Sequence, residues 1–445
     1  MKIQIQALWL IFVLLLSSCS VNSYLSEREK EFGTSGKNKW LFHRLSDRDK
    51  GTSLAFPGYV IGIEKAKRKN IGAPSRKDIR KNNGLQSFGF NERNNWDSIS
   101  NIKRWVLNDV KSMFLSSIFE FSSDQKPVDR ITVSSIYDAY DPSFLADSKN
   151  AYQNGFDELE KFRILLMESI TQKKVTHVFL FCMGWNSDQQ EAIRNFNSLF
   201  LKIMDNANLS KEEFNPIFIG ITWPSLWNEG FTNAFSFFNK TNDADEIGIT
   251  WANLILNKAI LSEKNKAKFK TVVLGHSFGA KLTSRATMSS SMLKEPSKPV
   301  DLLINLQSAY SINRYSKIKG IEPTADYVNW NKYVHHIALI CSENDGAVKN
   351  GFYAPFAGGI RSYNRVLSHP EQYPNIDLVA YKKGVATTFK YAEQLLLIDA
   401  SEIIRQEAYK KGGGAHSDIY NKEVSKMLWE LIHSSTYGQL PDNAK

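Results

Sequence analysis

One serine in this sequence stands where covalent chemistry is favoured. Ser277 is the centre of Gly275–Gly279 (GHSFG), a match to G-x-S-x-G, between the apolar run 271–274 and a segment with helical character. A strand-to-helix turn there must be sharp, and the flanking glycines remove side chains that would clash. Helix N-terminal N–H groups favour negative charge. We therefore predict that Ser277 is a nucleophile; the alternative is a structural serine in a glycine turn.

An acid that could support this chemistry follows a later predicted strand. Asp345 comes directly after the apolar segment 337–341. Hydrolases with a G-x-S-x-G turn place an acid and then a histidine after the serine, in that order. Glu343 and Asp301 are the competing acids, and a turn-forming aspartate is the alternative role for Asp345.

The histidine of this set is predicted to be His416. It follows Gly412–Gly414 and precedes a final helical segment, so a glycine-rich loop could carry it over the edge of the sheet. A serine hydroxyl needs a base to take its proton. We expect His416 to act as general base and then general acid, and Asp345 to fix its tautomer and stabilise its cation. His276 is expected to pack away from the pocket, and Asp418 to cap the last helix.

Two backbone N–H groups are predicted to stabilise the oxyanion. The first belongs to Phe278, by its position after the nucleophile. The second belongs to Trp185, in Cys182–Asn186 (CMGWN) after the predicted strand 175–181. Such donors contribute roughly 3–4 kcal/mol of barrier lowering each. Cys182 has no comparable turn, so we expect it, like Cys341, to be a buried thiol.

Apolar segments alternate with helical patterns from residue 155 onward. This alternation predicts a mostly parallel sheet with helices on both faces, the α/β class. Earlier in the chain, 54–63 and 130–136 are predicted strands and 99–114 a helix, so residues 56–150 are either early strands of the sheet or an N-terminal extension. The strands expected later are 175–181, 217–221, 271–274, 302–306 and 337–341, and the helices include 156–170, 280–292 and 419–432.

From about 155 to 435 the chain resembles the alpha/beta hydrolases. It is most similar to bacterial members whose third-strand turn reads H-G-W-N or H-G-F-N; Ile221–Ser225 (ITWPS) and Asn305–Ala309 (NLQSA) also carry the likeness. Met183 departs from the pattern, because it stands where that family usually has histidine. The resemblance implies an alpha/beta-hydrolase domain over 151–440 that cleaves a carboxylic ester without a cofactor.

The first residues predict a targeting signal. Lys2 precedes the apolar run Ala7–Leu16, which is too short to span a bilayer, and residues 1–18 therefore indicate a signal peptide. Leu16–Cys19 (LSSC) resembles the lipobox of bacterial lipoproteins, which implies acylation of Cys19 and an anchor in the cell envelope. Ser20 rather than aspartate follows, so the outer membrane is the expected location. Residues 19–55 are predicted to be a polar tether.

Composition excludes several other classes. The formal net charge is +10 from 56 basic and 46 acidic side chains over 445 residues, without long basic tracts, so a nucleic-acid partner is not indicated. Metal-ligand spacings and phosphate-binding glycine motifs are missing, so neither a metal nor a nucleotide cofactor is expected. The predicted partner is a small-molecule or lipid ester.

Some alternatives remain open at this point. The same three residues could serve an amide or thioester hydrolase or an acyltransferase, and a non-catalytic envelope binding protein on a hydrolase fold is the competitor from another class. The aromatic stretches 223–238 and 351–359 either line an apolar acyl site or belong to the core.

Overall fold

The computed structural model places most of the chain from residue 148 to residue 437, together with three earlier strands. The structure describes residues 54–65, 113–121, 134–135, 148–184, 187, 189–207, 209, 213–225, 237–265, 267–293, 297–315, 327, 329–349, 358–387, 389–391, 395–405 and 414–437. The predicted signal peptide, Cys19 and most of the tether lie outside them. Within these ranges no helix is both long and apolar enough to cross a membrane.

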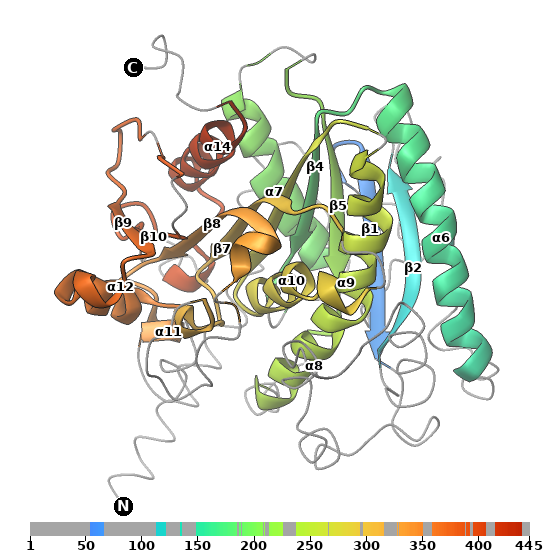
Figure 1. Ribbon diagram of the computed structural model, residues 1–445, viewed down its shortest axis with the longest axis horizontal. Coiled ribbons are helices and arrows are strands. Elements are labelled where there is room, and N and C mark those ends of the chain that lie inside the picture. Colours follow the sequence, from blue (N-terminus) through green and yellow to red (C-terminus); the bar gives the residue numbers. More distant parts are fainter. Residues whose placement is uncertain are drawn as a thin grey trace, which may run out of the picture.

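The described strands form one sheet of ten, in the order β3-β2-β1-β5-β4-β6-β7-β8-β10-β9 (Figure 1). Neighbours from β1 through to β9 run parallel, whereas β2 is antiparallel to both β1 and β3. The strands are β1 (Gly58–Lys65), β2 (Met113–Phe121), β3 (Ser134–Ser135), β4 (His177–Cys182), β5 (Pro216–Thr222), β6 (Lys270–His276), β7 (Val300–Leu306), β8 (Val334–Cys341), β9 (Ile376–Ala380) and β10 (Leu395–Asp399).

Side chains of successive strand residues enter two separate cores. Along β4, Val178 and Leu180 belong to one buried cluster, while Phe179 and Phe181 belong to the other. Successive side chains of a strand point to opposite faces of the sheet, so both faces of β4 are covered. This explains why the central strands are continuous apolar runs rather than alternating patterns. The α/β class predicted from the sequence is confirmed.

Helices cover the two faces unequally. One core is completed by α7 (Gln189–Ala207) and α14 (Lys422–Tyr437), through residues such as Phe196 and Met427. The other is completed by α6 (Ser148–Gln172), α8 (Phe237–Ile249), α9 (Trp251–Asn253), η2 (Leu254–Ile260) and α10 (Phe278–Met288) (Figure 1).

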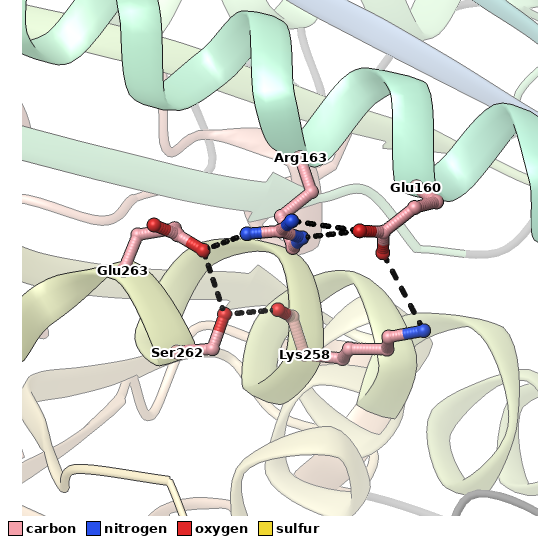
Figure 2. Close-up of polar contacts among 5 residues, drawn as sticks. All are labelled: Glu160, Arg163, Lys258, Ser262 and Glu263. Atoms are coloured by element: carbon pink, nitrogen blue, oxygen red, sulfur yellow. Dashed lines mark hydrogen bonds and ion pairs between the residues drawn. The ribbon is translucent and has the colours of Figure 1, made fainter.

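A polar cluster fastens α6 to the segment that follows α9. Arg163 binds Glu160 on its own helix and Glu263 in η3 (Leu261–Asn265), while Lys258 of η2 lies 3.5 Å from Glu160 (Figure 2). Ser262 adds hydrogen bonds to the Lys258 carbonyl and to Glu263. These contacts hold α6 along the edge of the hydrophobic layer formed by η2.

Some boundaries differ from those predicted. Met113 and Phe114 begin β2, so they are not the end of a helix, and residues 99–112 lie outside the described part of the chain. The last helix begins at Lys422 rather than near 419, and the N–H of Val424 is capped by Asn421 Oδ1 at 3.0 Å. Asp418 is not that cap, because its Oδ2 accepts the N–H of Arg405.

Candidate active site

The turn that carries Ser277 is strained and tightly packed. Ser277 has φ 55° and ψ −121°, between the last residue of β6 and the first of α10. A Cβ at Gly275 would stand 2.4 Å from Ala280 Cα, and one at Gly279 would stand 2.1 Å from the carbonyl oxygen of Cys182. Both glycines are therefore required by the close approach of backbone to backbone.

Neighbouring strands hold this turn in place. The Ser277 N–H donates to the carbonyl of Leu306 at the end of β7, at 3.0 Å. The Ser277 carbonyl accepts the N–H groups of Ala280 and Ala309, both at 3.1 Å. The strained conformation is thus fixed from three directions, which is what keeps such a geometry populated. The Ser277 residue is 8% exposed.

Asp345 lies in the turn between β8 and the short helix α11 (Gly346–Lys349) and is fully buried. Its Oδ1 accepts the N–H of Ala347 at 3.0 Å, and its Oδ2 lies 2.8 Å from Nδ1 of His416. A carboxylate oxygen can only accept here, so Nδ1 carries the proton and Nε2 is left as the basic nitrogen of a neutral ring.

His416 sits in the short turn Ala415–Ser417, which follows Gly414 with φ 64°. Its side chain is 23% exposed. Burial opposes protonation of the ring, but the charge of Asp345 and the hydrogen bond to it outweigh burial and raise the pKa of His416 above its ordinary value. The arrangement thus stabilises an imidazolium at this position.

The histidine ring and the serine meet at the same edge of the sheet. The His416 ring lies 4.9 Å, centroid to centroid, from the ring of His276, the residue immediately before Ser277. Among the contacts within the described ranges, no hydrogen bond joins Ser277 Oγ to His416. In hydrolases without substrate this bond is commonly long and tightens only in the complex.

The two competing acids lie elsewhere. Glu343 has an exposed side chain, two residues before the buried Asp345. Asp301 stands at the amino end of β7, where it accepts the N–H of Thr271 and pairs with Lys264. His416 lies at the opposite, carboxyl end of the strands, so neither acid takes the place of Asp345.

The segment after β4 presses against the serine turn. A Cβ at Gly184 would stand 2.5 Å from Ser277 Cβ and 3.1 Å from its Oγ. Phe278 begins α10, so its N–H is directed as expected of a helix N-terminus. Trp185, the other predicted oxyanion donor, lies outside the described residues.

Residues after β5 brace this segment on both sides of Trp185. The indole N–H of Trp223 donates to the Met183 carbonyl at 2.8 Å. Ser225 Oγ accepts the N–H of Ser187 at 2.9 Å and donates to its carbonyl at 2.7 Å. Met183, which replaces the histidine of the resembling family, places its sulfur 3.7 Å from the hydroxyl of Tyr420.

A comparison with known protein families supports the fold. Residues 160–349 match the family described as "Alpha/beta hydrolase of unknown function (DUF900)". The chain has an alpha/beta-hydrolase fold. The match spans the predicted nucleophile and acid, and it ends before His416.

Solved structures add no further assignment. An acetylxylan esterase is 10% identical over 58% of this chain and 98% of its own, with a TM-score of 0.25. A tryptophan synthase alpha chain from Legionella pneumophila subsp. pneumophila is 10% identical over 60% and 97%, with a TM-score of 0.19. Both TM-scores are too low to support an argument. No curated protein matches this sequence.

The described residues give little support to a cysteine nucleophile or a metal site. Cys182 and Cys341 are free and buried, as predicted, and burial raises the pKa of each thiol far above its usual value, which disfavours a thiolate nucleophile. Within the described ranges no group of three or more histidine, cysteine or acidic residues could hold a metal. The stretches 226–236 and 351–357, expected to shape a pocket, are outside those ranges.

Two residues near His416 make contacts that the sequence did not predict. Gln307, inside the NLQSA segment, donates its side-chain amide to the backbone of Ala415 and His416. His276 is buried and donates to the His416 carbonyl. A sequence signal existed only as the likeness to hydrolase segments, which assigns no role to either side chain.

Proposed function

We propose that this protein is a serine hydrolase that cleaves a carboxylic ester through an acyl-serine intermediate. Ser277 is the nucleophile, His416 the general base and acid, and Asp345 the residue that orients His416. The observation that carries the proposal is the 2.8 Å hydrogen bond from His416 Nδ1 to Asp345 Oδ2, formed across 71 residues of sequence beside the strained Ser277 turn.

The reaction follows from these positions. Ser277 Oγ attacks the carbonyl carbon while its proton passes to His416 Nε2, and the carbonyl oxygen becomes an oxyanion. The proton then passes from His416 to the leaving alkoxide as the carbon–oxygen bond breaks, which releases the alcohol. Water, activated by the same nitrogen, attacks the acyl-serine and releases the acid.

Each supporting residue has a separate task in this scheme. Asp345 holds Nδ1–H and opposes the positive charge that His416 gains, so Nε2 is left free to act as the base. The Phe278 N–H, at the start of α10, faces the developing oxyanion together with a donor from the turn after β4. We assign that second donor to Trp185.

A fluorophosphonate probe tests the nucleophile. Wild type and Ser308→Ala should be labelled, since Ser308 is a serine at the same edge of the sheet without a part in the reaction. Ser277→Ala should not be labelled. Undiminished labelling of Ser277→Ala, with the variant folded by circular dichroism, would refute the assignment.

The substrate class is tested by turnover. p-Nitrophenyl esters of graded acyl length should be hydrolysed by the chain that starts after Cys19, and the preferred length sizes the acyl site. Matched anilides and thioesters separate ester cleavage from the alternatives. Turnover of anilides in preference to esters would overturn the ester assignment while leaving the three residues in their roles.

The proposed location is the cell envelope. The support is the LSSC segment at Leu16–Cys19, which resembles a lipobox. Two or more acyl chains anchor a protein stably, whereas one is marginal. Growth with radiolabelled palmitate should label the wild-type protein and not Cys19→Ala; equal labelling of both would contradict the anchor.

A further inference from the structure

Two side chains from neighbouring strands converge on the backbone of the His416 turn. His276 is the last residue of β6 and Gln307 the first residue after β7. His276 Nε2 lies 2.9 Å from the His416 carbonyl oxygen. The Gln307 amide nitrogen lies 3.1 Å from the same oxygen and 2.9 Å from the Ala415 carbonyl.

The protonation of His276 follows from its partner. A carbonyl oxygen can only accept, so Nε2 carries a hydrogen. Burial, and then the charge that His416 can carry, lower the pKa of His276 to about 3, so the ring is neutral and Nδ1 has no proton. Nδ1 is indeed buried without a hydrogen-bond partner within the described ranges. A bare lone pair there leaves no N–H donor unsatisfied.

Gln307 reaches the turn from a strained backbone. Its φ is 42°, which is uncommon for a residue other than glycine. The backbone N–H of Gln307 donates to Ile340 on β8 at 2.9 Å, and the residue is completely buried. Such strain is energetically costly and persists only where surrounding contacts enforce it. Here the strained residue aims an amide at two loop carbonyls.

The His416 turn needs such support because the chain approaches it through glycine. Gly412–Gly414 precede it in the sequence, and Gly414 has φ 64°, a conformation that glycine adopts freely. Ordering a backbone residue costs conformational entropy, most of all for glycine. Asp345 fixes the ring of His416, but among the described contacts it makes no hydrogen bond to the backbone of that residue. The bonds from His276 and Gln307 supply that second point of attachment.

We propose that His276 and Gln307 are positioning residues that hold the backbone of His416 so that its ring reaches Ser277. Both act through carbonyl groups of the turn and neither touches substrate. This inference rests on the proposed function, since it assigns a task in that reaction. It predicts a loss in the chemical step rather than in substrate binding.

Matched variants separate the hydrogen bond from the bulk of the ring. His276→Phe keeps an aromatic face against His416 and removes the donor, while His276→Gln keeps an N–H donor and removes the ring. Gln307→Asn tolerates the positive φ and withdraws the amide from the carbonyls. The control is His336→Phe, because His336 is another partly buried histidine. It lies near the amino end of β8, and its ring centroid is 4.3 Å from that of Tyr391.

Ester hydrolysis provides the first measurement. We expect kcat to fall by about 10-fold to about 100-fold in His276→Phe and Gln307→Asn with little change in KM, since small misplacements of a reacting group cost this much. His276→Gln should recover most of the loss, and the control should match wild type. Wild-type kcat in both His276→Phe and Gln307→Asn, or a fall in His276→Gln as large as in His276→Phe, would overturn the proposal.

A second measurement does not depend on turnover. The Nδ1 proton between His416 and Asp345 should give a downfield proton resonance, which should be lost or broadened in His276→Phe and Gln307→Asn and kept in the control. An unchanged resonance in both variants overturns the positioning role. If wild type hydrolyses no ester but shows the resonance, the proposed function fails while this test of position still stands. Circular dichroism and thermal unfolding of every variant identify loss of the fold. If His276→Phe does not fold, the kcat of His276→Gln tests the role of His276 instead.

Discussion

Gly184 and Ser277 are so close that a Cβ at position 184 would lie 2.5 Å from Ser277 Cβ and 3.1 Å from Ser277 Oγ. The segment after β4 therefore cannot carry a side chain at this point without moving the serine. The same contact brings the backbone of that segment beside the hydroxyl, which is where a donor to an oxyanion must stand.

We expect Gly184→Ala to damage activity more than stability. The added methyl has to displace Ser277 or the segment after β4, at a cost of about 1–3 kcal/mol in the free energy of unfolding. kcat should fall at least about 10-fold, because the serine and the oxyanion donors lose their mutual geometry. Urea unfolding and ester kinetics measure the two effects, and wild-type kcat in a folded variant would contradict the assignment.

The strain at Ser277 predicts that activity and stability conflict there. Glycine adopts positive φ without the penalty that other residues incur. Ser277→Gly should therefore be more stable than Ser277→Ala by roughly 1 kcal/mol, although both lack the nucleophile. Denaturant unfolding of the two variants side by side gives the difference. Equal or reversed stabilities would mean that the turn relaxes when the hydroxyl is removed.

If His416 is the general base, as we propose, its raised pKa should set the pH dependence of the reaction. Burial opposes protonation, but Asp345 favours it more strongly, so kcat/KM should fall as pH drops through this raised value because a protonated ring cannot act as a base. Asp345→Asn should move the acid limb to lower pH while reducing kcat, on the order of 10⁴-fold in a comparable triad. A pH–rate profile for both proteins is the measurement, and an unmoved limb would show that another group titrates.

The same shift has a consequence for stability. A pKa that is higher in the folded than in the unfolded state means that protonation of His416 favours folding. This contribution is complete below the unfolded-state pKa of the ring and disappears as pH rises through the folded-state pKa. It should be absent in His416→Asn, so the difference in unfolding free energy between the two proteins should change across that window.

Trp223 is expected to act through the segment that it braces. Trp223→Phe keeps an aromatic ring in the core and removes the 2.8 Å bond to the Met183 carbonyl. One such bond contributes about 1 kcal/mol to stability. We also expect kcat to fall roughly 10-fold, since we propose that the segment carries an oxyanion donor. Trp330→Phe, at a buried tryptophan in the turn before β8, is the control; equal effects in both variants would indicate general loss of packing.

A buried ion cluster links α8 to α10. Asp245 Oδ1 lies 2.8 Å from Arg285 Nε, and its Oδ2 lies 2.9 Å from Lys281 Nζ. Asp245→Asn should destabilise the protein by about 3–5 kcal/mol, because it removes the charge that compensates buried cations. Asp245→Asn with Lys281→Met should recover part of this loss in urea unfolding. No recovery would indicate that Lys281 finds compensation elsewhere.

Local sequence predicted much of the fold because buried parallel strands consist of consecutive apolar residues. β4 and β7 are buried at every position, and both strands were predicted from their apolar residues. The short strands β9 and β10 were not predicted. β2 was not predicted either, and its first two residues, Met113 and Phe114, were expected to end a helix. An apolar segment of this length is compatible with either structure until its neighbours are known.

The candidate site, too, was predictable from local sequence only in part. Ser277 could be singled out because its strand, glycines and helix are adjacent in sequence, and those adjacent residues dictate the turn. Asp345 and His416 could be named only by their order along the chain. The contact between them depends on how β8 and the turn before α14 are placed, and no local pattern encodes that.

The α/β class, the sharp turn at Ser277 and the types of residue available for acid–base chemistry were all predictable without coordinates, because each depends on neighbours within a few residues. Only the tertiary structure decided that Asp345 rather than Asp301 meets His416, that Met183 is held by Trp223, and that His276 and Gln307 support the histidine turn. The physical reason is that these hydrogen bonds join residues 40 to 140 positions apart, whose distance is set by the register of the parallel strands and the packing of both cores.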